Sequence, residues 1–550
     1  MSSNNKVGTP TGHAPGMPAS PDKRDQADDV TALEIEMVNV AENTDHIKPS
    51  PWTLSMLRLY GVLFCAYFGA GTNGYDGSVM GGLNAMASYQ QYFNMETASA
   101  STGLVFAIYG IGTIAGLPLV GPVNDYFGRR AGMFTGATIV IIGTLVISQS
   151  LNTGMFLGGR FILGFGVGFC NISAPVYVGE MAHPYWRGTL MGIYSSFGGI
   201  GSIVATWVVY AAQYRGWSGW RLPLWCQLIP SGILFTFVWT LPESPRWLVA
   251  QGRLRSAKEV LVRYHGEGDS NHPLVKLQMA EMEAQISTVG SDKRWWDYRE
   301  LWSTRPARRR LLCVLTMATF GQWSGSSLTS AYLPVMLENA GITSQQKKLM
   351  LNGIFTVLTF LANLCGARLM DKVGRRPLLL GTLSFCIVCF AIIVPTSKFA
   401  IENPHNSAIA NTTVAFIYLF GLSIYLAWAP LSPMYIVEVL DTNTRAKGKS
   451  LAQLFTAVAS TVITYSSSPA FAALKYYIYL IFIGWDLLEL TVIYFFWPET
   501  KGRTLEELEE VFSAPNPVKK SLEPKTSQTV VNTMKAGAED LEMRNAANAA

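Results

Sequence analysis

Long uninterrupted apolar stretches dominate this 550-residue chain, in place of the alternating or amphipathic patterns of soluble proteins. A helix needs about 20 apolar residues to cross the hydrocarbon core of a bilayer. Twelve stretches reach that length, with ends defined to within a few residues: 56–82, 102–124, 131–150, 155–180, 188–212, 221–242, 310–338, 350–370, 377–397, 412–438, 447–470 and 476–497. The pattern therefore predicts an all-α membrane protein with twelve transmembrane helices.

Polar segments separate these helices into two groups of six. They divide the chain into an N-terminal tail (1–55), a six-helix bundle (56–242), a linker (243–309), a second six-helix bundle (310–497) and a C-terminal tail (498–550). The N-terminal tail is polar and rich in Pro and Gly, so we expect it to be disordered and to contain no cleaved signal peptide. The linker contains amphipathic stretches such as RSAKEVLVRYH, which predict short helices.

The distribution of Lys and Arg among the connections predicts the orientation in the membrane. Connections on one side carry ten basic residues in short loops and thirteen more in 243–310, whereas those on the other side carry six. The side richer in basic residues faces the cytoplasm. We therefore expect both termini in the cytoplasm and the protein in the plasma membrane. Asn411, in the tripeptide Asn-Thr-Thr near the start of a span, is then an external glycosylation acceptor.

Composition supports a chain embedded in lipid. Charged residues make up 14% of it, against roughly 25% in soluble proteins. Of the 79 charges, 50 lie in residues 1–55, 243–310 and 498–550, which excludes a soluble enzyme and a disordered scaffold. The net charge of +5 is spread out, so nucleic acid is not an expected partner. The seven Cys lie in apolar stretches without the spacing of a metal site, and we expect no metal and no cofactor.

An internal repeat relates the two groups of spans. Three motifs recur in the same order, 246 to 258 residues apart: Asp125-x-x-Gly128-Arg129-Arg130 as Asp371-x-x-Gly374-Arg375-Arg376, Glu180-x6-Arg187 as Glu438-x6-Arg445, and Pro242-Glu243-Ser244 as Pro498-Glu499-Thr500. One chance match would mean little, but three in order imply two six-helix pseudo-repeats. Parallel repeats of this kind build a central cleft that opens to one side of the membrane at a time.

From about residue 57 to 512 the chain resembles the sugar porter family of the major facilitator superfamily. The motifs that carry the resemblance are GYDGSVMGG at 74–82, GPVNDYFGRR at 121–130, GRFILGFGVG at 159–168, PVYVGEMAHPYWRG at 175–188, PESPRWL at 242–248, DKVGRR at 371–376 and PETKGRTLEE at 498–507. The chain looks closest to fungal lactose-permease-like and hexose-transporter-like members. The resemblance implies a carrier of sugars or similar polyols, driven by protons or by the substrate gradient, with its binding site near the bilayer midplane.

The repeated motifs place charges of both signs at the cytoplasmic ends of the spans. The residues are Asp125, Arg129, Arg130, Glu180, Arg187 and Glu243 in the first half, and Asp371, Arg375, Arg376, Glu438, Arg445 and Glu499 in the second. We interpret them as a cytoplasmic gate, in which ion pairs between the halves hold the inner side shut. Exposed pairs contribute about 0–1 kcal/mol each, which suits a latch that must also release. The alternative is that they only anchor loops and fix the topology.

Four charges lie inside the spans, where each costs at least about 2.5–3.5 kcal/mol and marks a candidate functional residue. They are Asp76, Arg160, Asp486 and Glu489. In sugar porters the acid of the first span faces the arginine of the fourth, so the resemblance pairs Asp76 with Arg160. The hypothesis is that Asp76 binds Arg160 when deprotonated and releases it on protonation; the alternative is a static ion pair. Glu489 is interpreted as structural, whereas Asp486 has no assigned role, a second proton site being the alternative.

The resemblance also indicates where a substrate would bind, although the match is weaker there. Gln322, Tyr332 and Trp428 occupy matching positions, Ser195 and Ser327 stand where typical members have an amide, and Gly321, Ala331 and Pro433 replace larger polar or aromatic residues. Fewer long amides and more small residues predict a wider, less polar cavity. Such a cavity favours a larger or less hydroxylated compound, because a site that pairs with hydroxyls selects strongly for them.

Proton-linked transport of a sugar or sugar-like solute is the function that these observations favour. Transport of a non-sugar metabolite, in either direction, is the first alternative: a quinate-like acid, a glycoside or a secondary metabolite. A non-transporting nutrient sensor is another, although its usual long C-terminal extension is missing from 498–550. No set of nucleophile, base and acid has a usable spacing, so we do not expect an enzyme. The expected partners are the solute, the proton and membrane lipid.

Overall fold

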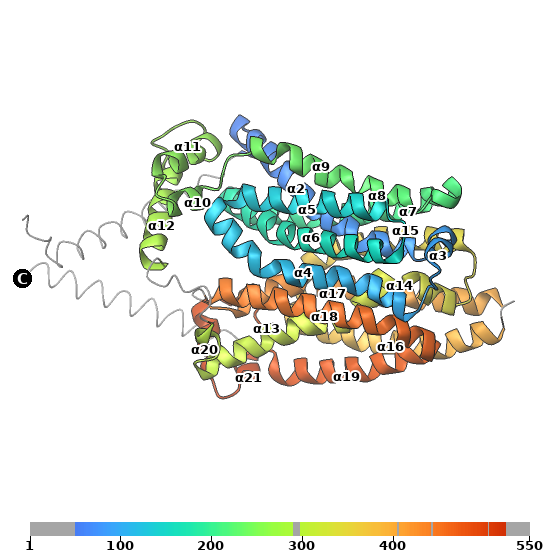
Figure 1. Cartoon of the computed structure of the whole chain (residues 1–550). Coiled ribbons are helices and arrows are strands. Elements are labelled where there is room, and N and C mark those ends of the chain that lie inside the picture. Colours follow the sequence, from blue (N-terminus) through green and yellow to red (C-terminus); the bar gives the residue numbers. More distant parts are fainter. Residues whose placement is uncertain (1–49, 290–297, 404–405, 442–443, 504, 524–550) are drawn as a thin grey trace, which may run out of the picture.

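The computed structural model describes residues 50–289, 298–403, 406–441, 444–503 and 505–523 (Figure 1). Most of the N-terminal tail predicted to be disordered, residues 1–49, lies outside this part of the chain, as do residues 524–550 of the C-terminal tail. The described residues form helices and no strand. The long helices gather into two bundles that lie side by side (Figure 1).

The first bundle contains the helices between residues 54 and 240. They are α2 (Leu54–Leu83), α4 (Ala100–Phe127), α5 (Arg129–Ser148), α6 (Thr153–Met181), α7 (Arg187–Ala212), α8 (Arg221–Cys226) and α9 (Leu228–Phe237), with the short α3 (Ala87–Phe93) after α2. Hydroxyl or amide side chains cap several of these helices, because their first backbone N–H groups have no partner within the helix. Thr53, Ser99 and Asn152 each accept a hydrogen bond from the amide three residues on.

The second bundle contains α13 (Arg305–Trp323), α14 (Ser326–Asn339), α15 (Gln345–Val373), α16 (Arg375–Glu402), α17 (Ser407–Val439), α18 (Arg445–Leu474) and α19 (Ile478–Phe496). Sequence analysis predicts one unbroken span over 310–338, and this continuity is wrong. The helix breaks at Gly325, which has a φ of 100°. A Cβ atom at Gly325 would lie 2.5 Å from Cζ of Phe420, so both the backbone angle and the space require glycine.

Ten segments of the described chain are long and apolar enough to span a membrane. One of them, Lys447–Phe496, holds two successive helices, α18 and α19. The pair α13 and α14 is not counted, because α13 has four arginines in its first six residues and α14 has only 14 residues, although together the two helices cross the second bundle. The described helices therefore make the twelve passes that the apolar pattern predicts.

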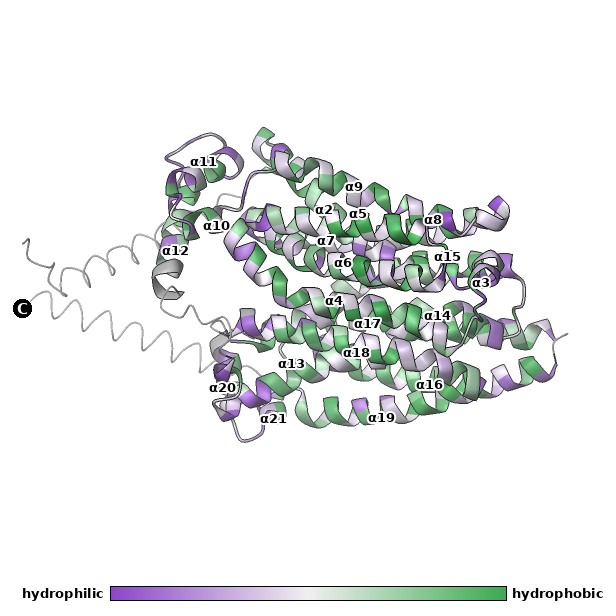
Figure 2. Cartoon of the chain, viewed as in Figure 1, coloured by the Kyte–Doolittle hydropathy of each residue, from purple (hydrophilic) through white to green (hydrophobic). Residues whose placement is uncertain are grey.

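The outer surfaces of the helices are apolar, as contact with lipid requires. On α19, Ile481 and Phe495 are 58% and 63% exposed, whereas Asp486 and Glu489 on the inner side are fully buried. Figure 2 shows hydrophobic residues along the shafts of the long helices and hydrophilic residues gathered toward their ends. The outer surface of the shafts is therefore apolar like the core, and the few charged groups within the shafts, such as Asp486 and Glu489, are buried.

Short helices cover one end of both bundles. In the linker these are α10 (Pro245–Ala250), α11 (Leu254–Tyr264) and α12 (Pro273–Val289), and in the C-terminal tail α20 (Leu505–Ser513) and α21 (Pro517–Leu522). All five lie at the left of Figure 1, and α3 lies at the opposite end. We call these ends the linker face and the α3 face.

Close helix packing recurs at equivalent places in the two bundles. In the first, a Cβ atom at Gly164 of α6 would lie 2.1 Å from the carbonyl oxygen of Tyr109 in α4. In the second, a Cβ atom at Gly366 of α15 would lie 1.8 Å from the carbonyl oxygen of Leu426 in α17. Small residues allow transmembrane backbones to approach this closely. The two bundles therefore repeat a packing contact as well as a sequence motif.

Buried histidines fasten the linker to the first bundle. The Nε2 atom of His265, which follows α11, lies 3.1 Å from the carbonyl oxygen of Met181, and its Nδ1 atom lies 2.8 Å from Oε1 of Gln278 in α12. The His183 ring packs against His265 at 5.2 Å between ring centres. Burial lowers the pKa of His183 to about 4, with a further effect from His265, and burial also lowers the pKa of His265. Both rings are therefore neutral in the docked linker.

We expect acidification to loosen the docked linker. An undocked histidine binds a proton below its ordinary pKa of about 6.5, whereas these two do not, so the free energy of docking weakens as pH falls through that value. Amide hydrogen exchange in α11, corrected for its intrinsic pH dependence, should accelerate between about pH 7.5 and about pH 5.5. The double variant His183→Gln, His265→Gln should lose this dependence. Equal α11 protection at both pH values in the unaltered protein would contradict the expectation.

Candidate functional site

A cavity of about 590 Å³ lies between the two bundles. Residues of α2, α4 and α6 line it from the first bundle, and residues of α13, α14, α17 and α18 line it from the second. This volume is in the range of small-molecule sites. Because both bundles supply the walls, any movement of one bundle against the other changes the cavity.

Asp76 of α2 lines this cavity and is 1% exposed. Its Oδ1 atom accepts a hydrogen bond from Nε2 of Gln227, between α8 and α9. Sequence analysis missed Gln227, although an amide in the middle of the apolar stretch LWCQLIP is a usable signal. Gln227 is itself 1% exposed, so this bond satisfies a polar group that would otherwise be buried without a partner.

Arg160 of α6 lines the same cavity and is 3% exposed. Its guanidinium lies over the ring of Tyr109, 4.7 Å from the ring centre, in a cation–π contact. Within the described residues no ion pair joins Arg160 to Asp76. The structure thus brings the two predicted coupling residues to one cavity, while each has a different immediate partner.

Three buried polar atoms around the cavity have no hydrogen-bond partner among the described residues. They are Oδ2 of Asp76, Nε of Arg160 and Nε1 of Trp428. A buried polar group without a partner costs roughly 1–3 kcal/mol, so such groups are rare and call for a partner. The three residues line the cavity, but these atoms have almost no exposed surface, so a solute would reach this acceptor and these two donors only after a small shift of the side chains.

Two of the five residues predicted to bind substrate, Tyr332 and Ser195, do not line the cavity. Gln322, Ser327 and Trp428 line the cavity as expected. Tyr332 instead is fully buried, and its hydroxyl donates to the carbonyl oxygen of Thr464 at 2.6 Å. The break at Gly325 and the non-helical φ of −118° at Tyr332 turn this residue out of the register that an unbroken helix would give.

Ser195 is the other predicted substrate residue that does not line the cavity. It is exposed on α7, where its hydroxyl donates to the carbonyl oxygen of Met191 at 3.2 Å. Serine in a membrane helix commonly bonds in this way to the preceding turn. In this conformation neither Ser195 nor Tyr332, both predicted to bind substrate, lines the cavity.

A polar stripe on α18 lines the cavity and was missed by sequence analysis. Its members recur at helical spacing on one face: Lys449, Gln453, Thr456, Ser460 and Thr464. The period of three to four residues is readable in the sequence once the helix is known to face a cavity rather than lipid. Asn73 of α2 is a further missed cavity residue, and it accepts a hydrogen bond from Asn171 at 3.2 Å.

The two bundles meet closely toward the α3 face. The Ser99 amide and the Ser468 hydroxyl lie 3.1 Å apart across this junction, and Phe106 packs against Tyr332 with ring centres 5.1 Å apart. At Gly81 of α2, a Cβ atom would lie 2.9 Å from the carbonyl oxygen of Ser330 in α14. These contacts close the cavity toward the α3 face.

Five of the six predicted gate residues of the first bundle, all but Arg187, form one network at the linker face. Nε of Arg129 donates to Glu180 at 3.0 Å, and the Arg129 amide donates to Glu243 at 3.1 Å. The Ser244 hydroxyl also donates to Glu180, at 2.5 Å, and Asp125 lies 3.5 Å from Arg129. Glu243 also accepts from the Arg130 amide at 3.4 Å, and burial raises the pKa of this carboxyl. The network joins α4, α5, α6 and the start of α10.

The second bundle repeats this network group by group. Arg375 donates to Glu438 at 2.7 Å, its amide donates to Glu499 at 3.1 Å, and Thr500 donates to Glu438 at 2.5 Å. Asp371 lies 3.3 Å from Arg375. The second arginine of each motif, Arg130 or Arg376, donates to a backbone carbonyl of the sixth span of its half. The sequence repeat therefore encodes a repeated ion-pair network.

Ion pairs between the halves are expected from the sequence, but each ion pair that joins predicted gate residues in the described structure lies within one half. Arg187 and Arg445 occupy equivalent places at the starts of α7 and α18, and the Nε atom of each has no hydrogen-bond partner among the described residues. In this conformation the bundles are thus linked toward the α3 face, while their charged networks at the linker face remain separate.

Three other predicted residues lie away from the cavity. Asp486 is fully buried and neither of its carboxyl oxygens has a hydrogen-bond partner among the described residues, whereas Glu489 accepts from the indole of Trp485. Asn411 is exposed on the second turn of α17. Thr413, which completes its acceptor tripeptide, is fully buried and donates to the carbonyl oxygen of Ile409 at 3.0 Å.

A family model described as "Sugar (and other) transporter" matches residues 62–512, which is most of the chain. The chain belongs to this family. It is thus a membrane transporter of the sugar porter group in the major facilitator superfamily, and the twelve-helix fold predicted from its sequence is confirmed.

Curated relatives of this sugar porter are fungal transporters. The quinate permease of Emericella nidulans is 28% identical over 84% of this chain and 90% of its own length. The transporter criB of Aspergillus cristatus is 27% identical over 80% of this chain and 90% of its own. The glucose transporter mfs1 of Aspergillus flavus is 26% identical over 86% and 93%. The names of these relatives imply different substrates, although their sequence identities to this chain are similar.

Solved structures share the fold of this sugar porter. The inward open conformation of the xylose transporter XylE from E. coli has a TM-score of 0.68 at 21% identity, over 82% of this chain and 99% of that one. The nucleoside transporter NupG has a TM-score of 0.52 at 16% identity, over 78% and 98%. The same architecture thus carries chemically different solutes.

We expect Gly81→Leu to open the junction toward the α3 face. Its side chain would meet backbone atoms of α14, which cannot move aside as a flexible side chain would. Amide hydrogen exchange should therefore accelerate in α3 and in the first turn of α4. Gly61→Leu on the same helix is the matched control, because nothing lies within 4 Å of a Cβ atom there. Unchanged exchange in Gly81→Leu would show that the contact does not hold the bundles together.

Proposed function

We propose that this sugar porter carries a sugar or sugar-like polyol across the plasma membrane together with a proton, by alternating access. The observation that carries the proposal is the cavity between the two halves, with partnerless polar atoms of Asp76, Arg160 and Trp428 around it. A polyol offers hydroxyls that both donate and accept hydrogen bonds, and the indole of Trp428 offers an apolar face for a ring. Alternating access follows from a cavity walled by two repeats.

Hydroxyl recognition is proposed to rest on amide and hydroxyl side chains from the second half. Gln322 and Ser327 lie on one side of the cavity and Gln453 with Ser460 on another. A second candidate substrate is a polyhydroxylated acid, of the kind that the name quinate permease implies for a relative. Arg160 and Lys449, the basic residues of the cavity wall, favour this candidate over a neutral sugar.

Proton coupling is proposed to act through Asp76. When deprotonated, its carboxylate accepts from Gln227 and lies in the same cavity as the Arg160 guanidinium. Protonation removes that negative charge, which weakens the electrostatic attraction of Asp76 for the Arg160 guanidinium and the hydrogen bond that ties α2 to α9. One proton moving through about 100 mV gains about 2.3 kcal/mol, and one pH unit adds about 1.4. Together these support a several-hundredfold accumulation.

The conformation described here is proposed to be the one open to the cytoplasm. The bundles meet toward the α3 face, and the basic residues of the loops predict that the linker face is cytoplasmic. In the opposite conformation Arg187 and Arg445 would reach the acidic networks of the other half and close the inner side.

Glycosylation of Asn411 is also a proposal. The burial of Thr413, the third residue of the acceptor tripeptide, opposes it.

We expect Asp76→Asn to abolish accumulation and to preserve exchange down a gradient, because an amide keeps the hydrogen bond but cannot titrate. The measurement is uptake of labelled solute into proteoliposomes, with and without an imposed pH gradient. Glu489→Gln is the control, since it neutralises another buried acid that does not line the cavity. Accumulation by Asp76→Asn at the level of the unaltered protein would eliminate Asp76 as the coupling residue.

The substrate class follows from uptake of labelled sugars, polyols and organic acids into a transporter-deficient host. A protonophore should abolish accumulation of the true substrate. Gln322→Ala should lower the apparent affinity for a hydroxylated substrate about tenfold to a hundredfold, as expected for a lost buried hydrogen bond. Ser195→Ala should have no effect on affinity, because Ser195 does not line the cavity. Uptake insensitive to the protonophore would indicate a facilitator.

A further inference from the structure

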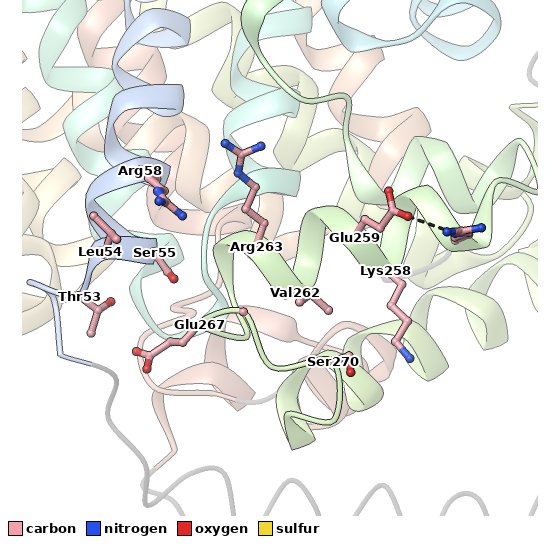
Figure 3. A pocket seen from close by; sticks show the side chains of 12 residues that line it. Thr53, Leu54, Ser55, Arg58, Lys258, Glu259, Val262, Arg263, Glu267 and Ser270 are labelled. Carbon is pink, nitrogen blue, oxygen red and sulfur yellow. Dashed lines mark hydrogen bonds and ion pairs between the residues drawn. The ribbon is translucent and has the colours of Figure 1, made fainter.

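A second cavity of about 730 Å³ lies at the linker face, between the first turn of α2 and the linker helix α11 (Figure 3). Thr53, Leu54 and Ser55 line it from α2 and its cap, and residues of α11 and the following loop line the other side. The transport site uses none of these residues. The cavity therefore requires an explanation of its own.

Basic side chains dominate the walls of this cavity. Arg58, Arg255, Lys258 and Arg263 face two acids, Glu259 and Glu267. One basic and one acidic residue are already joined, since Arg255 lies 3.2 Å from Glu259. In Figure 3, Arg58 from α2 and Arg263 from α11 project to the same side of the cavity. In the described part of the chain, Arg58, Lys258 and Arg263 have no ion-pair partner.

The remaining charges leave a net charge of +2 on the cavity wall, from Arg58, Lys258 and Arg263 against Glu267. Like charges that share a concave site repel one another and concentrate anions. The cavity thus favours a ligand that carries at least two negative charges.

An apolar stripe runs from this cavity along α2. Leu54, which lines the cavity, is 64% exposed, and Leu57 and Phe64 are 46% and 53% exposed on the same helix face. Gly61 continues the stripe, and nothing lies within 4 Å of a Cβ atom at that position. The stripe therefore offers an open apolar surface that is continuous with the basic cavity.

This stripe is on the outer side of α2. Phe64 and Asn73 are nine residues apart, which is two and a half helical turns, so they point in opposite directions. Asn73 lines the transport cavity, and the stripe therefore faces away from it. Trp52, just before α2, is 79% exposed at the end of the stripe, where aromatic residues mark the membrane interface.

We propose that this cavity binds an anionic phospholipid whose headgroup carries at least two negative charges. The phosphates lie against Arg58, Lys258 and Arg263, and an acyl chain lies along Leu54, Leu57 and Phe64. The apolar stripe distinguishes this ligand from a soluble phosphate or an acidic peptide, neither of which needs it. Basic pockets beside transmembrane helices on the cytoplasmic side are suited to such headgroups. Because its walls come from α2 and α11, the lipid joins the linker to the first bundle.

The test is lipid binding to the full chain in nanodiscs of phosphatidylcholine doped with phosphatidylinositol 4-phosphate, measured by native mass spectrometry. We expect retention of the doped lipid by the unaltered protein. Retention should fall about a hundredfold in the triple variant Arg58→Gln, Lys258→Gln, Arg263→Gln, given the contribution of each basic residue near a membrane surface. The variant Lys276→Gln, Arg308→Gln, Lys519→Gln removes the same charge from exposed positions outside the cavity and should retain the lipid.

Three outcomes would overturn the proposal. The first is equal lipid retention by the unaltered protein and the triple variant, and the second is equal loss in both triple variants. The third is binding of a soluble competitor to the unaltered protein, but not to the cavity variant, at least as tightly as the lipid binds, because the apolar stripe would then contribute nothing. Inositol 1,4-bisphosphate is one such competitor and would identify a soluble anion. A peptide of residues 25–45, with seven acidic and no basic residues, is the other and would identify the N-terminal tail as the occupant.

Discussion

A pair of carboxylates holds each half of this transporter together: one accepts hydrogen bonds from an arginine side chain, and the other accepts them from the backbone amides of a helix N-terminus. Glu180 with Glu243 in the first half, and Glu438 with Glu499 in the second, join the ends of four chain segments at the linker face. The backbone amides at the starts of α5 and α16 have no partner within their helices, so the acids satisfy groups that would otherwise be exposed. Each half can then move as a unit, because its own helices are fastened to one another.

The contacts between the halves are of a different kind. Small residues and aromatic rings meet toward the α3 face, and the ion pairs of the predicted gate residues stay within their own halves. Weak, non-ionic contacts between two internally fastened units permit rocking. The cavity lies between these two units, and the polar atoms without hydrogen-bond partners lie in its walls.

The sequence assigned each residue to a helix and to a depth in the membrane, but it did not show in which direction the side chain points from that helix. Tyr332 matches a substrate position in the family pattern, yet the break at Gly325 turns it into the wall toward the α3 face. Ser195 lies on α7, which contributes no residue to the cavity wall. Gln227 was missed because only the packing of α9 against α2 brings its amide to Asp76. Lys449 was counted as a topology signal, and its contact with the cavity depends on the rotation of α18.

By itself, the sequence determined the twelve spans, the two halves and the residues of the duplicated charge network, because these follow from local hydrophobicity and from a repeat written in the chain. It also identified Asp76 and Arg160, since a charge in a lipid-embedded span is costly and therefore conspicuous. Only the tertiary structure decided which face of each helix meets the cavity, which partners the charged groups have and at which end of the bundles the two halves meet. Those outcomes depend on how helices that are distant in sequence rotate and pack against one another. A helix that is apolar on all sides has little polar–apolar periodicity, so its sequence does not show which face points inward.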